Sequence, residues 1–149
     1  MASFAHLHCH TQFSLLDGAS DISLLYKKAV ADKMPGIAIT DHGNMFGVFK
    51  FVSEAAKYNV KGQDPVIKPI VGCEFYLVED RFKRQFTKTL KDKRYHQLMI
   101  AKNEVGYKNL CKLSSLGYIE GLYGKYPRID KKLVEQYHEG IIATSCCLG

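Results

Sequence analysis

The stretch HLHCHTQFSLLDG, residues His6–Gly18, decides how this sequence is interpreted. Its histidines stand at alternate positions, and Asp17 follows seven residues after the last of them. Because alternate residues of a strand point to the same side, His6, His8 and His10 would share one face. Imidazoles on one face, with a carboxylate from the next loop, suit a divalent metal better than three unrelated structural roles. His6 is the least suited of the three, since sites in α/β barrels gather at strand C-terminal ends.

The composition describes one domain over residues 1–149. The chain is 46% hydrophobic and 24% charged, which fits a soluble protein with a packed core. No apolar run approaches the roughly 18 residues of a membrane span, so no membrane partner is expected. The N-terminus lacks the basic and apolar regions of a signal peptide. Five cysteines without disulfide spacing indicate reduced thiols and a cytoplasmic protein.

The net charge of +6 comes from one segment, residues 81–94, which holds seven Lys/Arg and one acid. A solvated loop is the favoured interpretation. The alternative is contact with a nucleic-acid backbone, since clustered cations displace counterions from phosphates. The residues that would make this contact are Arg81, Lys83 and Arg84.

Hydrophobic periodicity predicts strands that alternate with helices. Strands are expected over residues 4–9, 36–40, 69–78, 96–101 and 141–144, and helices over residues 22–30, 48–58, 103–119 and 128–138. This order predicts an α/β fold with a mostly parallel sheet or barrel. A parallel barrel needs more strands, so we expect the chain to be the front part of a larger unit.

Further candidate ligands lie on or beside the other expected strands. Asp41 and His42 follow the second strand, and Glu74 interrupts an apolar strand, where a charge is costly unless it is paired or bound to metal. His96 opens the next strand, and Cys147 follows the last one. Each also has a purely structural explanation: a turn cap for Asp41, solvent-facing side chains for the other charged or imidazole groups, and a buried inert thiol for the cysteine.

Together, these positions favour a metal site at the mouth of an α/β barrel, because the five groups of candidates lie on or beside five different expected strands. Several histidines with carboxylates and few cysteines are typical of a catalytic, partly open site. Phosphoester hydrolysis is the reaction class that such a metal cluster serves.

Six segments carry a family resemblance. They are FAHLHCHTQFSLLDGAS, GIAITDHGNMFGVFKF, KPIVGCEFYLVEDRF, YHQLMIAKNEVGYKNLCKLSS, YPRID and EGIIATSCCLG, in this order over essentially the whole chain. They closely resemble the PHP (polymerase and histidinol phosphatase) domain at the N-terminus of bacterial replicative DNA polymerase III alpha subunits. HTQFSLLDG and GYKNL are similar to the polymerase version rather than to PHP proteins generally.

The resemblance implies a distorted (β/α)7 barrel, incomplete in this chain, with up to three divalent metals (Zn, Mn or Mg). His6 and Asp41 would be neighbours of ligands. TSCCLG matches a Ser-Gly-Cys pattern, which assigns Cys147 and leaves Cys146 in the glycine position. The implied metal ligands are His8, His10, Asp17, His42, Glu74, His96 and Cys147.

The resemblance also implies a parent protein. The family's last Asp-x-His ligand pair and the polymerase domains are expected beyond residue 149, so we expect a truncated piece of a DNA-directed DNA polymerase that acts in replication. Its PHP domain would be a metal-dependent phosphoesterase or a 3′–5′ proofreading exonuclease. The isolated piece is expected to be inactive, with an open barrel seam that lowers stability or promotes self-association. The implied partners are DNA, the remaining polymerase domains and other replicase subunits.

Two alternatives stand beside this interpretation. A degenerate PHP module would have a structural or subunit-binding role, but the retained His8, His42 and Glu74 favour an intact site. A stand-alone PHP phosphatase of the histidinol-phosphatase type would act on a small phosphoester, and the polymerase-specific segments argue against it.

Overall fold

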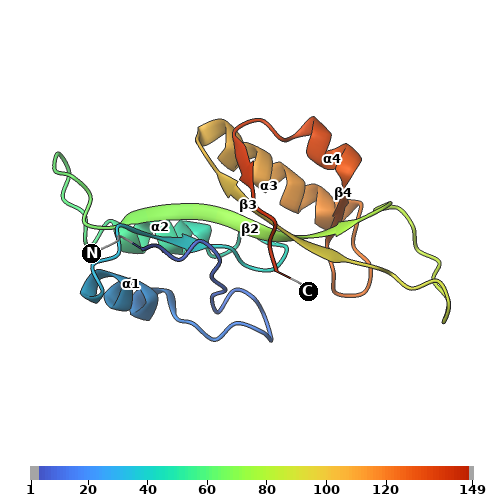
Figure 1. Cartoon of the computed structure of the whole chain (residues 1–149), viewed down its shortest axis with the longest axis horizontal. Coiled ribbons are helices and arrows are strands. Elements are labelled where there is room, and N and C mark those ends of the chain that lie inside the picture. Colours follow the sequence, from blue (N-terminus) through green and yellow to red (C-terminus); the bar gives the residue numbers. More distant parts are fainter. Residues whose placement is uncertain (1–3, 148–149) are drawn as a thin grey trace.

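The computed structural model describes residues 4–147, which form an α/β fold (Figure 1). In chain order the elements are α1 (Ile22–Ala31), β1 (Gly36–Ile39), α2 (Val48–Ala55), β2 (Lys68–Val78), β3 (Tyr95–Ala101), α3 (Glu104–Ile119), β4 (Arg128–Asp130), α4 (Lys131–Gln136) and β5 (Ile141–Ala143). The α/β class expected from the periodicity is confirmed.

The strands form one mixed sheet in the order β1-β2-β3-β5, and β4 also pairs with β2. β1 and β4 run parallel to β2, whereas β3 is antiparallel to both β2 and β5. Thus, among the strands of residues 4–147, β3 alone runs against the common direction, and its first residues lie near the ends of the other strands. Within residues 4–147 the sheet does not close, so the (β/α)7 barrel stays a prediction.

The expected strand over residues 4–9 is replaced by an irregular segment. It makes a single parallel bridge, between His6 and Ile37. The carbonyls of His6 and Cys9 accept hydrogen bonds from Ala38 and Thr40, each at 2.9 Å. The segment therefore advances by three residues, from His6 to Cys9, while β1 advances by two, from Ala38 to Thr40. The extra residue interrupts the regular hydrogen bonding between two strands.

The expected helix over residues 128–138 is also wrong at its start. Residues 128–130 instead form β4, which pairs with the end of β2 from Tyr76 to Val78. The helix α4 begins only at Lys131, where the side chain of Asp130 accepts a hydrogen bond from the backbone N–H of Leu133. This carboxylate cap fixes the start of the helix.

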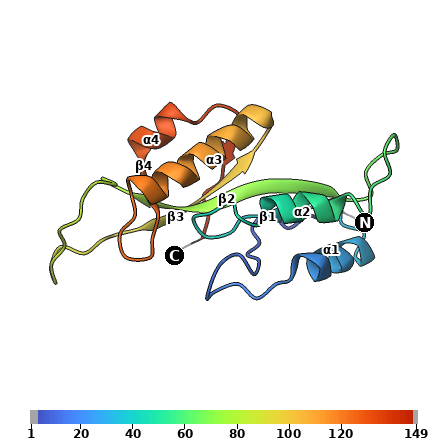
Figure 2. The ribbon, with the colours of Figure 1, turned by 180° about the vertical axis from the view of Figure 1, so that it is seen from behind.

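The helices cover one face of the sheet. Cys73 and Phe75 of β2 pack with α3 in one apolar cluster, while Ile37 and Ile39 of β1 pack with α1 and α2 in another. Figures 1 and 2 show these two groups of helices towards opposite ends of the long strand β2. Because strand residues alternate between faces, Glu74 points away from the helices.

No helix within the described range combines the length and the apolar character that a membrane span requires. The five cysteines, all of which are described, are free thiols.

Candidate metal centre

Glu74 lies at the centre of the candidate site, with only 1% of its surface exposed. Four imidazoles surround its carboxylate. Nδ1 of His42 and Nδ1 of His96 each lie 2.9 Å from Oε1. On the other oxygen, Oε2, Nε2 of His8 makes a close contact and Nε2 of His10 lies at 3.4 Å.

Strand pairing brings these side chains together. His42 follows β1 and forms a parallel bridge with Glu74. In this bridge the Glu74 N–H donates to the carbonyl of Asp41 at 3.1 Å, and the Gly43 N–H donates to the carbonyl of Glu74 at 2.7 Å. His96 joins them because β3 is antiparallel, which places its first residues beside the ends of the parallel strands.

Two further predicted ligands contact the histidines rather than Glu74. Oδ2 of Asp17 lies 2.5 Å from Nε2 of His42, and the Asp17 side chain is 67% exposed. Sγ of Cys147 lies 3.5 Å from Nδ1 of His96. The structure therefore gathers all seven residues that the resemblance implied as ligands: His8, His10, Asp17, His42, Glu74, His96 and Cys147.

Two buried atoms of this cluster have no hydrogen-bond partner among the described residues. They are Nδ1 of His42 and Oε1 of Glu74, which are close to each other without hydrogen-bonding geometry. A buried polar atom without a partner costs about 1–3 kcal/mol. A cation bound by both Nδ1 of His42 and Oε1 of Glu74 would give each of these atoms a partner.

The electrostatics keep Glu74 ionised. Burial acts to raise the pKa of Glu74, but the neighbouring imidazoles of His10 and His42 outweigh it and hold that pKa well below its usual range. In turn, the Glu74 carboxylate raises the pKa of His42, against burial, which acts to lower it. The site therefore presents an anionic centre inside a shell of nitrogen donors.

Among the described residues, the donor atoms other than that of Asp17 fall into three sets, each of which includes Glu74. Within each set the atoms lie within 4.8 Å of one another. Zn²⁺ binds such nitrogen, sulfur and oxygen ligands at about 2.0–2.3 Å, so ligand atoms on one ion lie a few ångströms apart. The residues fit a divalent metal. The sets are His8, Glu74 and Cys146; His10, His42 and Glu74; and Glu74, His96 and Cys147.

Asp41 holds the loop that carries the histidines. Its buried carboxylate accepts hydrogen bonds from the Thr11 N–H at 2.6 Å, the Thr11 hydroxyl at 2.8 Å and the Ser14 hydroxyl at 2.7 Å. The Ser14 hydroxyl also lies 3.2 Å from Nδ1 of His10. Sequence reasoning missed these two hydroxyl residues, because single hydroxyls in a loop have no periodic pattern.

His6 lies on the surface, where its ring packs edge-on against Phe4 with a centroid separation of 4.8 Å. Its backbone pairs with β1, and it is in none of the three donor sets. Its expected role as a neighbour of the ligands stays a prediction.

Arg81 and Arg84 of the basic segment are tied to the rest of the protein by hydrogen bonds, and Arg84 is exposed. Nε of Arg81 donates to Glu120 at 2.7 Å, and its Nη1 lies 2.9 Å from Asp130. Arg84 donates to the carbonyls of Arg81 and Glu120. The Nζ of Lys83 lies 5.7 Å from the centroid of the Phe86 ring. Contact of these three cations with nucleic acid stays a prediction.

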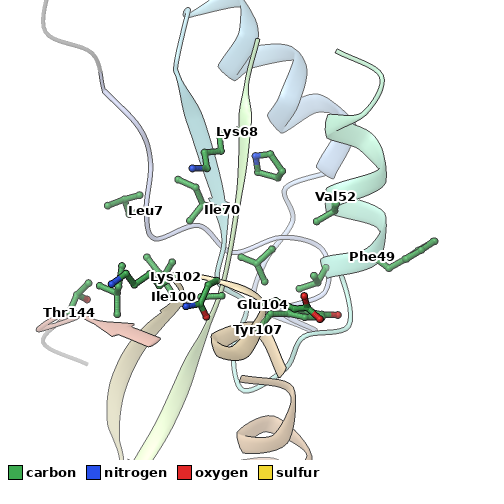
Figure 3. Close-up of a pocket in the computed structure, with 16 residues that line it drawn as sticks. Leu7, Phe49, Val52, Lys68, Ile70, Ile100, Lys102, Glu104, Tyr107 and Thr144 are labelled. Atoms are coloured by element: carbon green, nitrogen blue, oxygen red, sulfur yellow. The ribbon is translucent and has the colours of Figure 1, made fainter. Parts of the chain in front are cut away.

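A separate groove of about 780 Å³ lies over the N-terminal part of β2. Figure 3 shows Phe49 and Val52 of α2 on one side of it and Leu7 and Thr144 on the other. Its lining is mostly apolar and includes none of the seven predicted ligands. Its chemistry is therefore that of an apolar surface, and the histidine cluster is the better candidate for a reaction site.

The fold and the site define an α/β domain with a histidine–carboxylate cluster of the metal-binding type. The PHP domain family model matches residues 6–149. The chain therefore belongs to the PHP domain family.

Curated relatives are DNA polymerase III alpha subunits. The chain is 48% identical to the subunit from Borreliella burgdorferi, and the match covers 98% of the chain. It is 48% identical to the subunit from Aquifex aeolicus over 97% of the chain. It is 45% identical to the subunit from Thermus aquaticus over 98% of the chain. It spans only 12% of the length of each of these relatives.

Among solved structures, a candidate metal-dependent phosphoesterase from Bifidobacterium adolescentis has a similar fold. The TM-score is 0.54 at 19% identity, over 80% of this chain and 34% of the other. The likeness concerns the fold.

Proposed function

We propose that this chain is the PHP part of a bacterial DNA polymerase III alpha subunit. We further propose that its cluster binds divalent metals and hydrolyses phosphodiesters, as a 3′–5′ exonuclease on DNA. The observation that carries this proposal is Glu74, a buried carboxylate with imidazoles on both oxygens. Its Oε1 and the Nδ1 of His42 lack partners that a cation would supply.

The residues of the chain have distinct parts in this chemistry. When bound, a divalent cation supplies Lewis-acid stabilisation of phosphoryl charge and a more nucleophilic water near neutral pH. Glu74 and its imidazoles hold the cation, and Asp41 fixes the loop of His10 through Thr11 and Ser14. Asp17, the most exposed carboxylate of the cluster, orients His42 from the solvent side.

The polymerase context is supported by the relatives, which carry that name at 43–48% identity. DNA, the remaining domains of the subunit and other replicase subunits are the partners proposed on this basis. The sequence of the gene around the region that encodes these residues tests the proposal. A gene without polymerase domains would overturn it.

The metal and nuclease parts need a biochemical test. We would measure bound metal by elemental analysis and the Mn²⁺- or Zn²⁺-dependent release of 3′ nucleotides from single-stranded DNA. The chain and the full gene product would both be assayed, because we propose that the isolated chain is inactive. A His8→Ala, His10→Ala variant should lose metal and nuclease activity, whereas His138→Ala, at an exposed histidine outside the cluster, should keep both.

The ligand assignment and the exonuclease activity can each be refuted by a separate result. Equal metal content in the wild type and the double variant would overturn the ligand assignment. Full metal content in a gene product that releases no nucleotide would overturn the exonuclease.

A further inference from the structure

We propose that Cys146 is a second sulfur ligand of the metal centre, which binds on the His8 side of Glu74 while Cys147 binds on the His96 side. This inference rests on the proposed metal binding and adds a residue to it. The sequence pattern had left Cys146 in a position where the family resemblance implies glycine.

The position of the thiol supports this role. Sγ of Cys146 lies 4.0 Å from Oε2 of Glu74, the oxygen that Nε2 of His8 also contacts. A sulfur and an oxygen on one tetrahedral Zn²⁺ are about 3.5 Å apart, given bonds of about 2.3 and 2.0 Å. For these three side chains to share one ion, the thiol must move slightly closer to Glu74, and the imidazole of His8 must move back from it.

The carboxylate of this set carries a second sign of a ligand, on its other oxygen, which faces His42 and His96. Glu74 is buried, with 1% of its surface exposed, and its Oε1 has no hydrogen-bond partner among the described residues. The carboxylate is thus turned into the cluster without its full set of partners. A carboxylate with one oxygen towards Cys146 and the other towards His96 can bridge two ions.

The backbone at Cys146 is unusual for a cysteine. Its φ is +56°, in the left-handed region that glycine adopts freely and that other residues adopt rarely. Strain of this kind gathers at functional sites. Here the left-handed turn leaves the two adjacent thiols 3.9 Å apart and directs them to different sides of Glu74.

Two thiolates change the class of metal that this centre favours. Sulfur ligands select zinc and other thiophilic ions, whereas Mg²⁺ prefers oxygen. This chain should therefore bind Zn²⁺ or Cd²⁺ in preference to Mg²⁺ and Mn²⁺.

The test is the sulfur-to-metal charge-transfer absorbance of the purified chain loaded with Cd²⁺. Cys146→Gly should lose about half of this band, because one of two sulfur donors is removed. Cys147→Ser should lose a similar share, and the double variant should lose nearly all of it. Cys111→Ser is the matched control, at a half-buried thiol on α3 outside the donor sets, and should keep the full band.

Folding does not confound this test. Glycine suits the left-handed backbone, so Cys146→Gly should melt at or above the wild-type temperature, and Cys146→Ser offers a second variant of unchanged size. If the wild type binds Cd²⁺ and Cys146→Gly and Cys146→Ser both keep the full band, this inference fails while the proposed function stands. If the wild type binds no Cd²⁺, the proposed metal centre itself is overturned.

Discussion

His42 and Glu74 form a parallel backbone bridge, and Nδ1 of His42 lies 2.9 Å from Oε1 of Glu74. The pairing of β1 with β2 thus sets the distance between the side chains. A one-residue slip in this register would turn Glu74 to the helix-covered face of the sheet. The relative position of His42 and Glu74 is therefore a property of the sheet and not of a flexible loop.

The first prediction concerns Glu74→Gln, which keeps the size of the side chain and removes its charge. All three donor sets include Glu74, so metal affinity should fall by more than the roughly 10- to 100-fold typical of a lost supporting residue. Chelator competition measures this change. Glu79→Gln, at an exposed position just after β2, is the control, and equal affinities in the two variants would contradict the prediction.

The sequence predicted where β1, β2, β3 and β5 end better than it predicted the conformation of residues 4–9. Alternation placed His8 and His10 on one face, and their rings do lie together, with centroids 5.0 Å apart. The segment is nevertheless irregular, because the extra residue opposite β1 is a tertiary feature without a local pattern. β4 was missed for a similar reason: three residues that end in a helix cap are too short for a periodic pattern, and Arg128 is fully buried by contacts distant in sequence.

The residues of the candidate site were predictable where the chemical character of a side chain does not suit its local secondary structure. Glu74 is one example, a charged residue in an apolar strand, and the four imidazoles around its carboxylate explain why it is buried there. Asp17 came from the family resemblance alone, since nothing local distinguishes it from a residue at a helix entry. Cys146 could not have been found from the sequence, because its place in the cluster depends on a left-handed turn.

A second prediction concerns Asp41→Ala. The change leaves three donors on Thr11 and Ser14 without an acceptor, each worth roughly 1–3 kcal/mol when buried. The free energy of unfolding should fall by about 3 kcal/mol or more. Urea denaturation measures it. Asp32→Ala removes an exposed pair with Lys28 and should cost at most about 1 kcal/mol, so similar losses in the two variants would refute the role of Asp41.

A third prediction concerns pH and the pair of Asp130 with Arg81. Burial acts to raise the pKa of Asp130, but hydrogen bonds from the Leu133 and Arg81 backbone and from the Arg81 guanidinium lower it below its ordinary value of 3.8. A lowered pKa in the folded state stabilises the protein above the ordinary pKa. That contribution is lost as the pH falls through the folded value.

Asp130→Asn tests this effect and keeps a good helix cap. The wild type should be more stable than the variant at neutral pH, and the difference should shrink as the pH falls below about 4. Urea denaturation over this range measures it. Asp64→Asn, at an exposed position, should match the wild type throughout, and a pH-independent difference for Asp130→Asn would contradict the prediction.

The last prediction concerns Lys83 and single-stranded DNA. Arg81 is held by Asp130 and Glu120, so its removal would disturb the fold. The ammonium of Lys83 lies over the Phe86 ring and makes no ion pair among the described residues, so it is the cation that we expect to contact a phosphate. Lys83→Ala should weaken binding of an oligothymidine and lower the slope of log affinity against log salt by about 0.7, because one phosphate contact is lost. Fluorescence anisotropy at several salt concentrations measures both values. Lys61→Ala makes the same charge change at an exposed position outside residues 81–94 and serves as the control. An equal change in slope in this variant would contradict the prediction, because the effect would then come from net charge and not from a contact of Lys83.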